Sequence, residues 1–162
     1  MTIALISDTH GDLASDVLEH LKDVDEIWHA GDMGSLHCLE QMRAYKKTRA
    51  VYGNIDGADI RIDTEENLVW ESHGLKFLMT HIGGYPPKYN RRSLPMIDVI
   101  QPDVFICGHS HILKVMRDKK RNIIHLNPGA CGYKGFHQFR TFLKFDITPG
   151  GLKDMKVVEL GK

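Results

Sequence analysis

Two pairs of potential metal ligands in the sequence share the same spacing. Asp8 and His10 are separated by one residue, and so are His109 and His111. Each pair follows a short apolar run that has the length of a buried strand. Residues i and i+2 of an extended chain point to the same side, so each pair can direct two side chains at one point. Both pairs therefore indicate metal-binding chemistry at the ends of strands.

Three further expected strand ends carry side chains of the same chemical kind. One aspartate or histidine in a turn is weak evidence, because turns favour polar residues for backbone reasons. The combination is much stronger, since functional groups of strand-helix units gather beyond the carboxyl ends of the strands. The candidate metal ligands are Asp8, His10, Asp32, Asn54, His81, His109 and His111.

The chemistry of this set limits the metals that it can hold. The seven residues offer oxygen and nitrogen donors and no sulfur, which suits manganese, iron, zinc or magnesium rather than copper(I) or a cluster. Seven donors exceed the needs of one small cation, so we predict two divalent ions that share a carboxylate. Manganese is the expected metal, with zinc, iron, nickel and magnesium as alternatives. Gly31, Gly53 and Gly108 stand beside candidate ligands and permit tight turns there.

The elements that must position these residues follow from the apolar periodicity. Strands are predicted at 2–7, 26–29, 49–52 and 104–106, and helices at 14–22 and 35–45, with Ser35 as an N-cap. Turn signals predict hairpins that join 67–71 to 75–80, 112–117 to 122–126 and 140–147 to 155–160. A parallel start followed by hairpins predicts a layered α/β fold with two mixed sheets.

Composition narrows the class of protein further. The 162 residues suit a single domain spanning 1–162, and 21 basic residues balance 21 acidic ones. We therefore expect no membrane partner and no surface for long nucleic acids. Apolar runs are too short for a signal peptide or a membrane span, which predicts a soluble, cytoplasmic protein. The three cysteines are widely spaced and are expected to be buried and free. The sequence does not decide between a monomer and a homo-oligomer.

The ordered set of clusters resembles the calcineurin-like metallophosphoesterases, and more narrowly the small prokaryotic phosphodiesterases of that superfamily, to which the retromer subunit fold is related. The segments that carry this resemblance are Asp8-x-His10, Gly31-Asp32, Gly53-Asn54, His81, Gly108-His109-x-His111 and Asn127-Pro128-Gly129. The resemblance implies a four-layer α/β/β/α sandwich with two metals at one edge of the sheets. It also implies that Asp32 bridges an ion held by Asp8, His10 and His111 and an ion held by Asn54, His81 and His109.

The activity implied by the resemblance is hydrolysis of a small phosphodiester by a hydroxide that bridges the two metals, without a protein nucleophile. Asp32, Asn54 and His81 would act through the metals and the phosphate. A phosphomonoesterase with the same site is one alternative. The other is a protein-binding scaffold of the same fold, which should have lost its ligands, whereas every ligand type is present here.

Some positions depart from the family pattern or have open roles. Many members carry a histidine directly after the Gly-Asn pair, where it can serve the leaving group, but this chain has Ile55 followed by Asp56. We therefore do not expect efficient hydrolysis of esters with poor leaving groups. Asp56 is a candidate to orient the bridging water or to hold His10, and a turn-stabilising role is the favoured alternative. His29 is predicted either to orient Asp32 or to form a wall behind the site.

Two segments have roles that the sequence leaves open, the loop 82–92 and the segment 130–139. Arg91 and Arg92 are candidates for contact with a substrate phosphate or base, although an exposed loop followed by a helix start is the favoured interpretation. Tyr133, Lys134 and His137 are candidates for the lining of a pocket.

Overall fold

The computed structural model describes residues 1–162 and contains two five-stranded mixed sheets. In the first sheet, three neighbouring strands from the N-terminal part of the chain run parallel, and a C-terminal hairpin joins them antiparallel. The order is β12-β11-β1-β2-β3. The bounds are β1 (Thr2–Ile6), β2 (Glu26–His29), β3 (Lys47–Ala50), β11 (Arg140–Thr148) and β12 (Gly151–Leu160).

The second sheet comes from the middle of the chain and has the order β4-β5-β8-β10-β9. Its three central strands run parallel, and each edge strand pairs antiparallel with its neighbour. The bounds are β4 (Asn67–Ser72), β5 (Leu75–Thr80), β8 (Val104–Ile106), β9 (Leu113–Asp118) and β10 (Ile123–Pro128).

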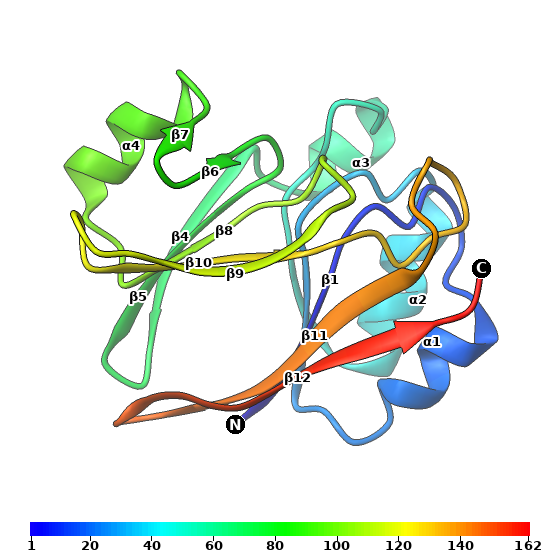
Figure 1. The fold of residues 1–162 in the computed structure, drawn as a ribbon. Helices are drawn as coiled ribbons and strands as arrows, with labels where there is room; N and C mark the ends of the chain where they lie inside the picture. The colour runs from blue at the N-terminus through cyan, green and yellow to red at the C-terminus, as the bar shows by residue number, and fades with distance from the viewer.

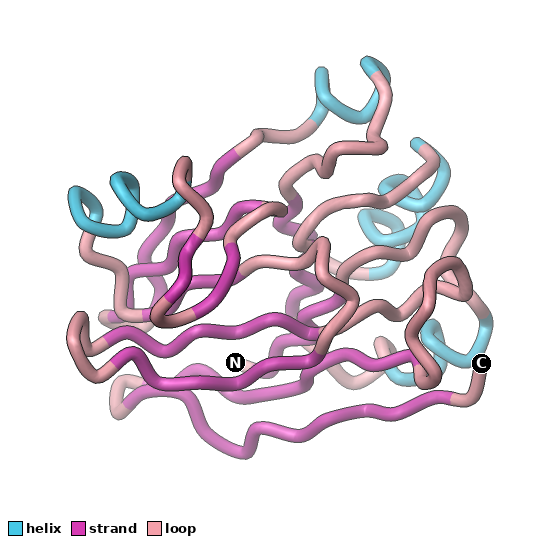
Figure 2. Tube along the Cα trace, turned by 45° about the horizontal axis from the view of Figure 1, so that its top comes forward, coloured by secondary structure: helices cyan, strands magenta, loops and turns pink.

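Helices cover the outer faces of both sheets, as Figures 1 and 2 show. Three of them lie beside the first sheet, and the fourth lies beside the second sheet together with a small two-stranded hairpin. The bounds are α1 (Ser15–His20), α2 (Leu36–Tyr45), α3 (Ala58–Asp63), α4 (Ser93–Ile100), β6 (Gly84–Tyr85) and β7 (Lys88–Tyr89).

Three apolar clusters hold the four layers together. The central cluster joins the inner faces of the sheets, and its largest members, Trp28, Trp70 and Phe77, pack with ring centroids about 5 Å apart. A second cluster packs α1, α2 and α3 on the first sheet, and a third packs α4 on the second. This arrangement is the predicted α/β/β/α sandwich of two mixed sheets, and the prediction is confirmed.

The predicted elements agree with the structure in type and differ in some bounds. Ser35 caps α2, since its hydroxyl accepts a hydrogen bond from the Cys38 N–H at 3.1 Å. The strand predicted at 49–52 begins two residues earlier, and the helix predicted at 14–22 is shorter at both ends. The short elements α3, β6 and β7 were not predicted, because each offers too few apolar residues to show a period.

Two expectations from composition can be compared with the structure. Cys38, Cys107 and Cys131 are buried and free, as predicted. None of the helices has the length and the apolar character needed to cross a membrane.

Candidate metal centre

The candidate ligands come from strand ends that the topology brings to one edge. Strands β1, β2 and β3 are parallel, and so are β5 and β8, so the loops that follow each set start from a common edge. Two groups of ligand-type side chains form there, and within each group the ligand atoms lie within 4.8 Å of one another. The groups are Asp8, His10 and His111, and Asp32, His81 and His109.

The first group joins the loop after β1 to the loop after β8. His111 Nε2 lies 3.3 Å from Asp8 Oδ1 and 3.2 Å from His10 Nε2. The other oxygen of Asp8 accepts a hydrogen bond from the His109 backbone N–H at 3.1 Å. Two segments about a hundred residues apart in the sequence are therefore fastened at the point where their donor atoms converge.

The second group is built on His81, which follows β5. His81 Nδ1 lies 2.7 Å from the carbonyl oxygen of Ala30, and the N–H at that nitrogen donates to it. This bond turns the lone pair of His81 Nε2 toward Asp32, whose Oδ1 lies 3.2 Å away. His109 completes this group, with its ring centroid 5.2 Å from that of His81.

Asp32 belongs to the second group and also faces the first. Its Oδ1 is 3.2 Å from His81 Nε2, while its Oδ2 is 3.9 Å from His10 Nε2. The Ile55 N–H donates to Oδ1 at 3.1 Å and fixes the carboxylate. The geometry of Asp32 therefore suits a carboxylate shared between two cations.

Two buried atoms in this centre have no hydrogen-bond partner, Asp8 Oδ1 and His81 Nε2. A buried polar atom without a partner costs about 1–3 kcal/mol, so such atoms are rare unless something else satisfies them. Both atoms face the donors of the two groups, and both are of types that ligate divalent cations. The residues present therefore fit a pair of divalent ions.

Burial and neighbouring charges shift the pKa of four candidate ligands, and three of these shifts are in the direction that favours cation binding. Burial lowers the pKa of His10 and that of His109, so both imidazoles are neutral and have free lone pairs near neutral pH. Burial alone would raise the pKa of Asp32, but His81 and the Ile55 N–H outweigh it and hold that pKa below its usual range. For His81, burial is outweighed by Asp32 and Asp8, which raise its pKa.

The backbone at the centre adopts a conformation that side chains rarely take. Five of the seven candidate ligands have positive φ angles between 51° and 69°. Such angles are uncommon outside glycine, and when they cluster they mark functional sites more often than ordinary turns. The five residues are Asp8, His10, Asp32, His109 and His111.

Two of the predicted glycines make room for the ligands themselves. A Cβ atom at Gly53 would lie 2.0 Å from Asp32 Oδ1, and one at Gly108 would lie 2.0 Å from Ser7 Oγ and 2.9 Å from Asp8 Oδ2. Their function is thus close approach of the backbone to a ligand, in addition to the tight turns that the sequence suggested.

The comparison with known protein families decides the membership of this chain. The model of the calcineurin-like phosphoesterase superfamily domain matches residues 1–150. The chain belongs to the calcineurin-like phosphoesterase superfamily. The resemblance noted in the sequence is confirmed.

Individual relatives agree with this membership. A probable metallophosphoesterase of Methanocaldococcus jannaschii is 30% identical over 136 residues, which cover 80% of this chain and 68% of the relative. An archaeal phosphodiesterase has a similar structure, with a TM-score of 0.70 and 24% identity over 99% of this chain and all of that one. Zinc-bound Vps29 from Entamoeba histolytica has a TM-score of 0.77 and 18% identity, with 99% of each chain covered.

Asn54 and Asp56, which follow β3 in this calcineurin-like chain, differ in burial and in contacts. Asn54 is exposed and lines a pocket together with His81. Asp56 is buried, and its carboxylate accepts backbone hydrogen bonds from Met33, Gly34 and Gly53 at 2.7–3.2 Å. Both of its oxygens are engaged in tying two ligand-bearing loops together, a geometry that fits the turn-stabilising alternative.

His29 lies behind the centre of this calcineurin-like fold and is fully buried. Its Nδ1 accepts a hydrogen bond from the Gly31 N–H at 3.1 Å, and its Nε2 lies 3.1 Å from Thr9 Oγ1. Burial lowers the pKa of His29 to about 4, so the ring is neutral. It therefore fixes the turns beside Asp8 and Asp32 rather than reaching the donors of either group.

Asn127, part of the late signature, also holds a ligand-bearing loop. Its side-chain amide donates to Gly108 O at 2.9 Å and to Ser110 Oγ at 3.1 Å, while its Oδ1 accepts from the Gly129 N–H at 3.0 Å. The loop with His109 and His111 is thereby fastened to the end of β10.

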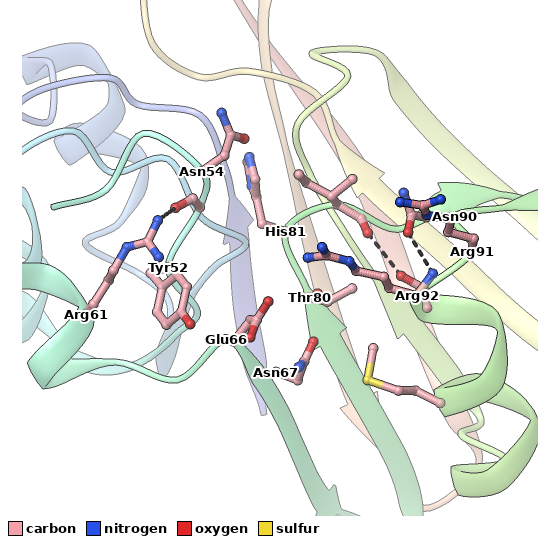
Figure 3. Close-up of a pocket in the computed structure, with 14 residues that line it drawn as sticks. Tyr52, Asn54, Arg61, Glu66, Asn67, Thr80, His81, Asn90, Arg91 and Arg92 are labelled. Carbon is pink, nitrogen blue, oxygen red and sulfur yellow. Dashed lines mark hydrogen bonds between the residues drawn. The ribbon is translucent and has the colours of Figure 1, made fainter. Parts of the chain in front are cut away.

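A pocket of about 670 Å³ adjoins the centre and shares His81 and Asn54 with it (Figure 3). Arg91 and Arg92 are exposed and lie in the turn before α4, as the sequence favoured, and both also stand in the wall of this pocket. The sequence did not indicate that Glu66 and Asn67 line the opposite wall, because they lie in a distant part of the chain.

The segment 130–139 lies beside the first group and does not line this pocket. The ring centroid of His137 is 5.2 Å from that of His111. The guanidinium carbon of Arg140 lies 4.0 Å from the ring centroid of Tyr133. Tyr133, Lys134 and His137 were candidates for pocket lining, and the pocket beside His81 contains none of them.

Proposed function

We propose that this chain is a metal-dependent phosphodiesterase that hydrolyses a small phosphodiester, with manganese as the expected metal. The observation that carries the proposal is the convergence of two ligand groups on two buried atoms without partners, Asp8 Oδ1 and His81 Nε2. Membership of the calcineurin-like phosphoesterase superfamily supports the reaction class. The likeness in fold to an archaeal phosphodiesterase supports the choice of a diester.

The chain contributes the ligands and their positions. One ion would be held by Asp8, His10, His111 and Asp32, and the other by Asp32, Asn54, His81 and His109. When bound, two such ions supply a water-derived nucleophile at neutral pH and positive charge that stabilises the phosphoryl oxygens in the transition state.

The task of the protein groups is to keep the donor atoms in place before substrate arrives. The Ala30 carbonyl fixes the ring of His81, the Ile55 N–H fixes Asp32, and the His109 N–H fixes Asp8. Donors held in advance do not need to be reorganised during the reaction, which is the usual source of catalytic power in such sites.

The leaving group receives no help from the position where many relatives have a histidine. Ile55 stands there, it is exposed, and its side chain cannot give a proton. Hydrolysis should therefore be efficient for esters whose leaving groups are stable anions, such as aryl esters. The adjoining pocket leaves room for a second ester arm, which favours a diester over a monoester.

A protein-binding scaffold is the alternative from another class, because Vps29 structures share the fold. Such a scaffold has no need of the ligand geometry seen here, with donors fixed by hydrogen bonds and a backbone bent at five ligand positions. Calorimetric titration with Mn²⁺ tests the ligand set, which should bind about two ions. Because the Vps29 structure itself holds zinc, hydrolysis of a diester is the measurement that separates the two functions.

The proposal is tested with an activated aryl diester, bis(p-nitrophenyl) phosphate, in the presence of Mn²⁺. We expect hydrolysis by the wild type and a loss of at least about 100-fold in Asp32→Ala and His109→Ala. His37→Ala is the matched control, because His37 is an exposed helix residue whose side chain is 61% accessible. Full activity in a metal-stripped sample would contradict the proposal, and faster hydrolysis of p-nitrophenyl phosphate would favour the monoesterase.

A further inference from the structure

The pocket beside His81 has one wall that is built onto the metal centre. The segment that carries Arg91 and Arg92 returns to the strand end that carries His81. The Asn90 N–H donates to Gly83 O at 2.9 Å, and Ser93 Oγ donates to Ile82 O at 3.0 Å. These two bonds hold Arg91 and Arg92 next to His81, although the arginines follow it by ten and eleven positions in the sequence.

The guanidinium groups of Arg91 and Arg92 are available for a ligand. Neither group takes part in a hydrogen bond or an ion pair within the protein. Other arginines of the chain pair with carboxylates, as Arg121 does with Asp98 at 2.7 Å. In Figure 3 the Arg92 side chain extends into the pocket, toward the side where Glu66 lies.

The third arginine of the pocket has a structural role. Arg61 Nε donates to Asp56 O at 2.7 Å, and its guanidinium lies 4.5 Å from the ring centroid of Tyr52. It therefore supports the far wall and adds positive charge, whereas Arg91 and Arg92 still have all their donors free.

The charge and polarity of the pocket indicate the kind of group that it takes. Three arginines face a single carboxylate, Glu66, which has no ion-pair partner in the chain. Only three of the 14 lining residues are hydrophobic, so an aliphatic chain would find little apolar surface. Arginine forks match carboxylate and phosphate oxygens in geometry as well as charge.

We propose that this pocket binds the arm of the substrate that lies beyond the scissile phosphate, and that Arg92 and Arg91 select an arm with its own carboxylate or phosphate group. This inference rests on the proposed phosphodiesterase function and specifies its substrate class. The substrate would be a small phosphodiester with a second anionic group, and the position of Arg92 within the pocket gives it the larger share of the selection.

The test uses p-nitrophenyl phosphodiesters whose alcohol arm has the same length and ends in a carboxylate, a phosphate, a neutral carboxamide or a trimethylammonium group. We expect kcat/KM for the anionic arms to exceed that for the carboxamide by about tenfold or more, and the trimethylammonium arm to react slowest. The carboxylate and phosphate probes also show which of the two anions the pocket prefers.

Variants assign the selection to individual residues. Arg92→Gln should reduce the ratio of the carboxylate to the carboxamide probe to about one, and Arg91→Gln should reduce it less. Arg117→Gln is the control, because Arg117 is an exposed strand residue outside the pocket that bonds Asn122 and should leave the ratio unchanged. Glu66→Gln should increase the ratio, since it removes the opposing charge.

A measurement independent of turnover uses nonhydrolysable phosphonates with the same arms, titrated calorimetrically into wild type and Arg92→Gln. Equal kcat/KM and equal affinity for the carboxylate and carboxamide arms would overturn the inference and leave the phosphodiesterase intact. If no probe is hydrolysed, the proposed function fails, while the titrations still show whether the pocket prefers an anionic arm. Preference for the trimethylammonium arm would assign the selection to Glu66 and would also overturn the inference.

Discussion

Two buried histidines on opposite faces of the second sheet share a residue type and differ in chemistry. His81, at the end of β5, has an unpartnered Nε2, and His125, within β10, has no partner for either ring nitrogen. His81 faces Asp32 and Asp8, which raise its pKa. His125 lies beside the rings of Phe105 and Tyr89, and burial, with a smaller effect of Lys114, lowers its pKa to about 4.

The difference shows that an orphaned imidazole is not by itself a sign of a metal site. Burial leaves both rings without water, but only His81 has carboxylates at 3.2 and 3.9 Å, with which it can share a cation. His125 has only a lysine as a charged neighbour, and a cation there would be repelled. The convergence of donors is therefore the informative feature, and it can be tested by altering each histidine in turn.

The largest effect is expected when His81 is replaced. His81→Ala removes a donor and exposes Asp32, so kcat/KM on the aryl diester should fall by about 1,000-fold, with loss of one bound ion by elemental analysis. His125→Phe, the matched change on the other face, should keep both activity and metal content within about twofold. A similar loss of metal in both variants would remove the distinction between the two regions.

A large effect is also expected from a residue that carries no functional group. Gly53→Ala places a methyl group where Asp32 Oδ1 lies, so Asp32 must move away from both ligand groups. Activity should fall by about 100-fold, and Mn²⁺ affinity, measured by calorimetry, should fall in parallel. Gly161→Ala, with no atom within 4 Å of its added carbon, is the control, and equal behaviour of the two variants would contradict the close approach.

The two histidines after β8 sharpen the comparison within the centre itself. His109→Ala and His111→Ala should each lower the metal content from about two ions to about one, because they belong to different ligand groups. The remaining ion should differ between the variants, which electron paramagnetic resonance of the Mn²⁺-loaded proteins can show. Identical spectra and identical losses would mean that both histidines serve the same ion.

The smallest effect on activity is expected at His125, whose replacement should change stability in acid instead. Its pKa is about 4 in the folded chain and about 6.5 in the unfolded chain, so the unfolded state binds the proton first as the pH falls. The contribution of His125 to stability is complete above about pH 6.5 and decreases toward pH 4, by about 3 kcal/mol in total.

His125→Phe should therefore lose less stability than the wild type over this interval, as measured by urea unfolding at each pH. Above about pH 7.5 the difference in unfolding free energy between the two proteins should stay constant as the pH changes. An equal pH dependence of both proteins down to pH 4 would show that His125 does not carry the effect.

The strand ends were predictable from the sequence because their signals are local. Apolar runs predicted the strands, and Asp8, Asp32, His81 and His109 each stand within three positions of a strand end. The N-cap of α2 at Ser35 was predictable for the same reason. Order along the chain, together with the parallel pairing expected of strand-helix units, was sufficient to place the candidate ligands at one edge.

The remaining features depend on contacts between distant segments. The pocket joins Glu66 and Asn67 to Arg91 and Arg92, and no local pattern relates these two stretches. The occupation of the Asp56 carboxylate by three backbone N–H groups could not be inferred either, because two of them belong to the loop after β2. Helix α4 includes Pro95 in its first turn, a position where proline is tolerated.

The left-handed backbone at five ligand positions has a consequence for the order in which the molecule opens. Each such residue costs about 1 kcal/mol relative to a relaxed conformation, so the loops at this edge hold less local stability than the sheets behind them. In hydrogen exchange, their amides should be among the first to exchange in the metal-free protein. These five residues lie in three loops, two from the first sheet and one from the second. Bound cations would join these loops, so metal loading should slow exchange at this edge and tie the two sheets together.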